Sequence, residues 1–249
     1  MRTLTLLMAL MLGLLTVPGE ENSSLAKENG YVINLDRAEK LEKMTYSSLF
    51  SKAGIIVLED TDESLLGKVD KLEVCDNNLY VLEKGRGLFL FNKQGKFIKM
   101  IGRQGKGPGE YIDPDDISID RENKKIYVLD SQTQNVLKYS GNGTFESSFK
   151  LENKGTRSTF IQPFKNALYT NLYTFDKSGK RFLLSKVDVT NGKRISFQFE
   201  ASQYNKGWNE LFSTDQHTFI SGPTGNPKFM QIFMDTIFEI TPKGIKPYI

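Results

Sequence analysis

The chain contains an internal repeat of about 47 residues. The segment LEVCDNNLYVLEKGRGLFLFNKQGKFIKMIG (72–102) aligns with ISIDRENKKIYVLDSQTQNVLKYSGNGTFESSF (117–149), and Tyr127 follows Tyr80 by 47 residues. Self-similarity at a fixed period of roughly 20 to 50 residues is typical of folds in which each unit packs only against its neighbours. The sequence therefore predicts a row of similar units around a shared core.

Each unit has the pattern of four short strands separated by polar turns. In the first unit the turns are DNN, EKGRG and NKQG, whose Asn and Gly residues supply the positive φ angles of tight hairpins. Two more diverged units follow, at about Phe160–Phe199 and from about Phe219 onward. The strands predicted for the first unit are near Lys71–Cys75, Leu79–Leu82, Leu88–Phe91 and Lys96–Ile101.

These patterns predict an all-β protein, a β-propeller of four-stranded antiparallel blades. A period in the 40s with four strands per unit is typical of propellers. The runs NLYVLE (78–83) and KIYVLD (125–130) are apolar on both alternations. A sheet with one face in water would alternate polar and apolar residues, so both faces of each predicted blade must be covered.

The stretch LFNKQGKFIKMIGRQGKGPGEY, followed by DISID and KKIYVLD, resembles the six-bladed β-propeller proteins with NHL-like repeats that occur among secreted proteins of Bacteroidetes. The most specific part of the match is Gly105–Tyr111, and the resemblance extends over about residues 45–249. It implies six blades, whereas the chain has length for about four. We therefore expect part of a six-bladed pattern, as from a truncated reading frame.

The N-terminus has the features of a secretory signal. Arg2 precedes an apolar run from Leu4 to Leu15, which is shorter than the roughly 20 residues that cross a bilayer. We expect a signal peptide at 1–19, a segment at 20–54 with a candidate ring-closing strand (YVINLD, 31–36), and propeller blades at 55–249. The expected location is secreted or periplasmic.

The composition excludes several kinds of site. The single cysteine, Cys75, permits neither an internal disulfide nor a cysteine-based zinc site, and it does not follow the apolar run as a lipid anchor would require. The net charge falls from +3 to +2 without the signal peptide, too little for a nucleic-acid-binding protein. His217 is the only histidine and no G-x-S-x-G motif is present, so no catalytic residue is predicted.

The loop GRQGKGPGEYIDPDD (102–116) is predicted to cross from the outer strand of one blade to the inner strand of the next. It lacks the Gly-Lys-Ser/Thr ending and the following helix of a phosphate-binding loop. Its three aspartates, Asp113, Asp115 and Asp116, do not have the spacing of a calcium loop, and we expect a solvated acidic turn.

Two groups of residues are candidates for ligand binding. Because blade crossings lie at one face of a propeller, Arg103, Lys106, Glu110 and Tyr111 are candidates to line the mouth of the central channel. The favoured alternative is that Arg103 and Glu110 only tie the loop to its neighbours. In the long link 200–229, the rings of Tyr204 and Trp208 are candidates to stack on a sugar or peptide, and packing of Trp208 between blades is the alternative.

The leading functional hypothesis is an extracytoplasmic binding module for a small molecule, glycan, peptide or protein partner. We expect no cofactor, no nucleic acid, no transmembrane anchor and no lipid anchor. The first alternative is a lactonase-like or lyase-like propeller enzyme that uses channel carboxylates and a divalent cation. The second is a fragment without a function, because fold alone does not determine what a propeller does.

Overall fold

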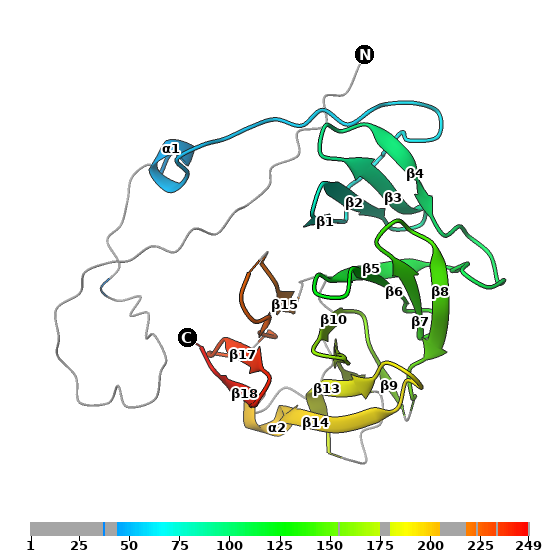
Figure 1. Ribbon diagram of the computed structural model, residues 1–249. Coiled ribbons are helices and arrows are strands. Elements are labelled where there is room, and N and C mark those ends of the chain that lie inside the picture. The colour runs from blue at the N-terminus through cyan, green and yellow to red at the C-terminus, as the bar shows by residue number, and fades with distance from the viewer. Residues whose placement is uncertain are drawn as a thin grey trace.

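The computed structural model describes Arg37 and residues 44–153, 155–174, 180–204, 218–222, 224–232 and 234–248. Within these residues the chain forms four antiparallel four-stranded sheets arranged as the blades of a β-propeller (Figure 1). The all-β prediction is confirmed. The predicted signal peptide and the predicted strand at 31–36 lie outside the described residues.

Each blade is a meander of four strands in chain order, apart from a small strand inserted in the third. A two-stranded sheet lies beside the third blade and consists of β9 (Thr156–Arg157) and β12 (Tyr173–Thr174). The described residues also form two one-turn helices, α1 (Tyr46–Leu49) and α2 (Ala201–Tyr204). The first blade has β1 (Lys71–Cys75), β2 (Asn78–Glu83), β3 (Gly87–Asn92) and β4 (Phe97–Ile101). The second has β5 (Pro114–Asp120), β6 (Lys125–Asp130), β7 (Asn135–Ser140) and β8 (Phe145–Lys150). The third has β10 (Ile161–Phe164), β11 (Ala167–Asn171), β13 (Phe182–Asp188) and β14 (Arg194–Glu200), and the fourth has β15 (Phe219–Ile220), β16 (Lys228–Phe229), β17 (Phe238–Thr241) and β18 (Gly244–Pro247).

The turns between the third and fourth strands repeat one backbone geometry. Gly95, Gly143 and Gly192 occupy this turn in the first three blades, with φ angles of 85°, 78° and 74°. An L-residue with a side chain rarely adopts such angles, whereas glycine does so freely. The repeat read from the sequence is therefore a repeat of turn chemistry as well as of strands.

Apolar side chains fill the spaces between successive blades. One buried cluster joins the first and second blades, another the second and third, and a third the third and fourth. In β2, residues 79–82 are all at most 3% exposed, so both faces of the strand are covered. The face of the first blade that lies away from the second blade is covered by apolar residues of the segment 56–69.

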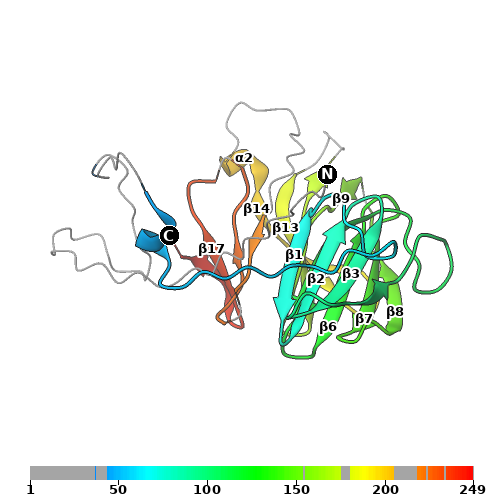
Figure 2. The ribbon, with the colours of Figure 1, turned by 90° about the horizontal axis from the view of Figure 1, so that it is seen from above.

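The sheets follow one another around a common centre. In Figure 1 the first strands β1, β5, β10 and β15 lie nearest this centre, and the fourth strands β4, β8 and β14 lie on the outside. Figure 2 shows the same blades from above, standing side by side. Polar residues on the inner strands therefore come together from segments far apart in the sequence.

Candidate functional site

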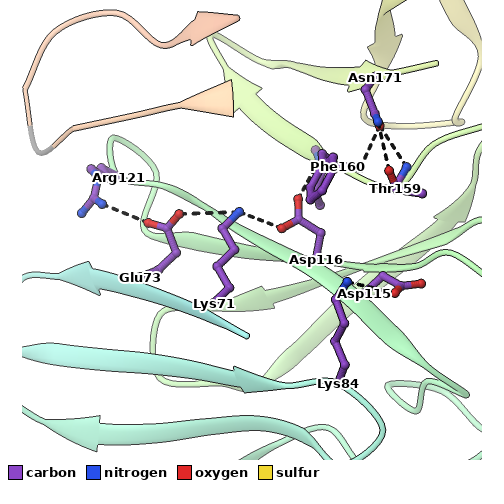
Figure 3. A network of polar contacts seen from close by, with 10 residues as sticks. Lys71, Glu73, Lys84, Asp115, Asp116, Arg121, Thr159, Phe160 and Asn171 are labelled. Atoms are coloured by element: carbon purple, nitrogen blue, oxygen red, sulfur yellow. Dashed lines mark hydrogen bonds and ion pairs between the residues drawn. The ribbon is translucent and has the colours of Figure 1, made fainter. Parts of the chain in front are cut away.

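A chain of charged residues connects the inner strands of three blades (Figure 3). Lys71 Nζ on β1 lies 2.7 Å from Asp116 Oδ1 on β5 and 3.9 Å from Glu73 Oε1. Arg121 donates a hydrogen bond to the other oxygen of Glu73 over 3.1 Å. The backbone N–H of Ile161 on β10 donates to Asp116 Oδ2 over 2.8 Å. This network joins the first, second and third blades.

The network is buried, and its charges neutralise one another. Asp116 is fully buried and Glu73 is 8% exposed. Burial raises the pKa of Glu73 above its ordinary value, and the positive charges of Lys71 and Arg121 oppose that rise. Since each carboxylate already has a cation or a backbone N–H as partner, the arrangement is suited to holding the blades together.

The expectation of a solvated acidic turn at 113–116 is wrong for its last residues. The strand β5 begins at Pro114, so Asp115 and Asp116 belong to the sheet. Asp115 lies 3.4 Å from Lys84, and burial raises its pKa. Among the residues that the structure describes, no group of three or more His, Cys, Asp or Glu side chains is placed to hold a metal ion.

The last residue of the second strand has the same role in three blades. Glu83 accepts a hydrogen bond from Gly67 N, and Asp130 accepts one from Ile112 N over 2.7 Å. Asn171 accepts from the backbone N–H groups of both Thr159 and Phe160, as Figure 3 also shows. In each case the side chain fixes the segment that leads into the first strand of its own blade. The polar residue that recurs at this position in three blades is a structural support for the crossings.

The crossing was predicted at 102–116; in the structure it comprises residues 102–113, and it does not lie at the central channel. It runs from β4 to β5 and projects on the outside of the propeller, on the side of β8 (Figure 1). Arg103 Nε donates to Glu110 Oε1 over 2.6 Å, and Gly107 N donates to Glu110 Oε2 over 2.8 Å. The hydrogen bond from Gly107 and then the one from Arg103 lower the pKa of Glu110. Glu110 thus has a structural role, as the favoured alternative supposed, but it joins parts of the loop to each other and not the loop to its neighbours.

Tyr111 lies in the core and not at a channel mouth. Its side chain is 1% exposed. The hydroxyl accepts a hydrogen bond from Leu88 N over 3.1 Å and donates one to Ile101 O over 2.9 Å. Tyr111 was a candidate because of its place in the crossing loop, but its side chain instead anchors that loop on the first blade.

The loop and the outer strand of the second blade enclose a groove, which we call the rim groove, of about 690 Å³. Lys106 and Glu110 line it from the loop. From the second blade come an aromatic ring and several polar side chains, namely Asn135, Phe145, Ser147, Ser148 and Lys150. The sequence interpretation missed these five residues. The available signal of an outer strand open to solvent was the run FESSFK, with its three successive polar residues Glu146, Ser147 and Ser148, all of which are exposed in the structure.

Tyr204 lies far along the chain from this groove, at the end of α2. Its ring meets that of Phe199 edge-on at 5.9 Å and packs into the apolar cluster between the third and fourth blades. Trp208 and His217 lie outside the described residues. The structure therefore brings Arg103, Lys106 and Glu110 together but places Tyr204 at a different blade interface.

Comparisons with known proteins agree with this fold. The model of a family described as a domain of unknown function (DUF4934) matches residues 30–249. A crystal structure described as a "Putative exported protein" from Bacteroides fragilis is 22% identical with a TM-score of 0.60, over 77% of this chain and 53% of that one. A member of the DUF4221 family from Bacteroides vulgatus is 10% identical with a TM-score of 0.50, over 71% of this chain and 56% of that one.

Virginiamycin B lyase from Staphylococcus aureus is 14% identical with a TM-score of 0.45, over 78% of this chain and 58% of that one, which is too distant to carry an argument. The chain thus spans little more than half the length of these solved structures. A search of curated protein sequences found no match. In the described part of the chain, no helix has the length and apolar character needed to span a bilayer.

Proposed function

The chain belongs to the family described as DUF4934, and from this premise we propose that it is an exported β-propeller that binds a polar ligand in its rim groove without catalysing a reaction. The observation that carries the proposal is that several polar side chains of the groove have no partner within the described part of the protein. Within the described residues, the side chains of Lys106, Asn135, Ser147, Ser148 and Lys150 make no hydrogen bond or ion pair.

The composition of the groove suits a ligand with both polar and apolar parts. Two lysines and two serines supply donors, and Asn135 supplies both a donor and an acceptor. Phe145 supplies an apolar wall, held edge-on against Tyr139 at 5.7 Å. Ligand sites typically combine an apolar surface with a few well-placed polar groups. A glycan, a peptide or a loop of a partner protein has this chemistry.

The wall formed by the crossing loop is already organised in the unliganded protein. Glu110 holds Arg103 and Gly107, and Tyr139 donates a hydrogen bond to Gly109 O over 3.0 Å. A preorganised loop loses little conformational entropy when a ligand binds. The charged residues that shape the loop, Arg103 and Glu110, are different from Lys106 and Lys150, the lysines that would contact the ligand.

Export is supported by the apolar run at Leu4–Leu15 and by the similarity to a structure described as exported. Secretion predicts that the protein recovered from its native host lacks residues 1–19 and begins at Glu20. N-terminal sequencing of that protein tests this. Recovery of the uncleaved chain from the cytoplasm would contradict it.

The binding proposal is tested by probing glycan and peptide arrays with the secreted chain. We expect a discrete set of ligands whose binding falls at least about tenfold in the double variant Lys106→Ala/Lys150→Ala, because both ammonium groups are lost. Lys93→Ala, which removes an exposed lysine outside the groove, is the matched control and should bind as the wild type does. Equal binding by the double variant would overturn the groove assignment. Turnover of a lactone or glycan that stops on chelation would favour the enzyme instead.

A further inference from the structure

A second hollow, of about 500 Å³, lies where the third and fourth blades meet. We call it the interblade hollow. It is separate from the rim groove and shares no residue with it. Its wall combines aromatic rings with polar side chains, and the six residues that matter here are Tyr169, Lys186, Ser196, Gln198, Phe199 and Phe238.

Three of the polar side chains stand in one row across the third blade. Lys186 on β13 is the direct cross-strand partner of Tyr169 on β11 and of Ser196 on β14. Directly opposed residues of neighbouring antiparallel strands share a face of the sheet. In the described chain, neither the Tyr169 hydroxyl nor the Lys186 ammonium has a hydrogen-bond or ion-pair partner. Burial raises the pKa of Tyr169, so its hydroxyl stays protonated and able to donate.

Gln198 adds an acceptor with no partner. Its Nε2 donates to Ser196 Oγ over 2.7 Å, which fixes the amide. Its Oε1 is buried and has no hydrogen-bond partner in the described residues. Buried polar atoms are normally paired, and an unpaired one lowers stability, so an exception in a hollow points to a missing donor.

The backbone of the next residue departs from strand geometry. Successive residues of a strand point to opposite faces, yet Gln198 and Phe199 both line this hollow. Phe199 has a φ of 60°, a left-handed conformation that bulky residues rarely adopt. Its ring lies 4.4 Å from that of Phe238 and stacks on Phe229 at 5.6 Å. The strained backbone thus turns an aromatic ring toward the fourth blade and beside the free carbonyl of Gln198.

We propose that the interblade hollow binds an acidic sugar residue of the uronic acid class. The carboxylate pairs with Lys186, and a ring hydroxyl donates to Gln198 Oε1 once the Gln198 side chain has turned to bring this buried atom to the wall of the hollow. The apolar C–H face of the sugar packs on Phe199 and Phe238. A neutral sugar would leave Lys186 without a counter-charge, and a simple aromatic acid would have no hydroxyl to donate to Gln198. An acidic sugar meets all three requirements at once.

Isothermal titration calorimetry of the secreted chain with trigalacturonic acid, and with the neutral maltotriose as matched ligand, tests the proposal. We expect saturable binding of the uronate and at least tenfold weaker binding of maltotriose. Lys186→Met should reduce uronate binding at least tenfold. The rim-groove variant Lys106→Ala/Lys150→Ala should keep that binding, which separates failure of this site from failure of the groove.

Gln198→Leu distinguishes a ligand contact from a structural role. Gln198→Leu relieves the unpaired Oε1 but also removes the hydrogen bond from Nε2 to Ser196 Oγ, so the two effects oppose each other and the melting temperature should change little while uronate binding falls at least tenfold. Absence of uronate binding, equal affinity for maltotriose, or full binding by Lys186→Met would overturn the proposal. If Gln198→Leu fails to fold, Lys186→Met alone decides the outcome.

Discussion

Asp116 in the second blade accepts a hydrogen bond from the backbone N–H of Ile161 in the third, although the two residues are 45 positions apart. Its other carboxylate oxygen lies 2.7 Å from the ammonium of Lys71 in the first blade. One fully buried carboxylate therefore connects three sheets that have no hydrogen-bonded strand pairs between them.

Asp116→Ala should lower the free energy of unfolding by about 3 kcal/mol or more, because it leaves a half-buried cation and a buried N–H without their partner. Urea denaturation measures this loss. The control is Glu122→Gln, which breaks an exposed ion pair with Lys165 and should cost less than about 1 kcal/mol. Equal losses in the two variants would show that the inner network does not hold the blades.

Two glycines with similar φ angles allow backbone strain to be separated from steric contact. Gly95 and Gly85 have φ angles of 85° and 80°. A Cβ at Gly95 would lie 1.9 Å from Val57 O, whereas a Cβ at Gly85 would meet nothing within 4 Å. Gly85→Ala should therefore cost about 1 to 2 kcal/mol of stability from strain alone.

Gly95→Ala should cost about 1 to 3 kcal/mol more than Gly85→Ala, because the segment around Val57 must also move away. Thermal denaturation of the two variants side by side measures the difference. Similar melting temperatures would mean that this segment does not pack on the turn as described. Gly192 has the same relation to Lys150 O, also at 1.9 Å, so Gly192→Ala should behave like Gly95→Ala.

The blades were predictable from the sequence because they depend on local patterns. Strand alternation, Asn and Gly turns, and the 47-residue repeat all act within one unit, and the predicted strands of the first unit are confirmed. The partners of Asp116 were not predictable in this way, since Lys71 and Ile161 each lie 45 residues away. A cluster of aspartates looks the same in a sequence whether it is solvated or buried.

The candidate sites show the same limit. The favoured alternative assigned Arg103 and Glu110 a structural role as ties from the loop to its neighbours, but it did not predict that the two side chains pair with each other. The position of the crossing loop on the rim was not predicted, because it depends on how the blades are arranged around the centre. The positive φ angle of Phe199 was not predictable either, because it contradicts the local preference of a phenylalanine. It is imposed by packing of the ring against Phe229 and Phe238.

The buried carboxyl of Glu73 should give the protein a specific pH dependence. Burial raises the pKa of Glu73 in the folded state above the ordinary value of 4.5. At a pH between 4.5 and the higher pKa of the folded state, the Glu73 carboxyl is protonated more often in the folded protein than in the unfolded chain. The contribution of Glu73 to stability is therefore fully present below pH 4.5 and falls as the pH rises through its folded-state pKa.

Urea midpoints of the wild type and of Glu73→Gln, measured from pH 4 to pH 8, test this dependence. The variant cannot titrate at this position, so its stability relative to the wild type should rise as the pH increases. Glu122→Gln serves as the control, because it removes a carboxylate from an exposed ion pair, and its stability should stay within about 1 kcal/mol of the wild type over the whole range. Parallel curves for Glu73→Gln and the wild type would contradict the raised pKa of Glu73.

Tyr111→Phe separates a structural from a ligand-binding role for the most buried residue of the crossing loop. The change removes one acceptor for Leu88 N and one donor to Ile101 O, both within the core. Stability should fall by about 1 to 3 kcal/mol because two buried backbone groups lose their partner. Tyr46→Phe, at a tyrosine that is 66% exposed, is the matched control and should be nearly neutral. Any ligand found for the rim groove should still bind Tyr111→Phe at a temperature where the variant is folded, since the hydroxyl points into the first blade. Loss of that binding with unchanged stability would instead make Tyr111 a ligand contact, as its place in the sequence first indicated.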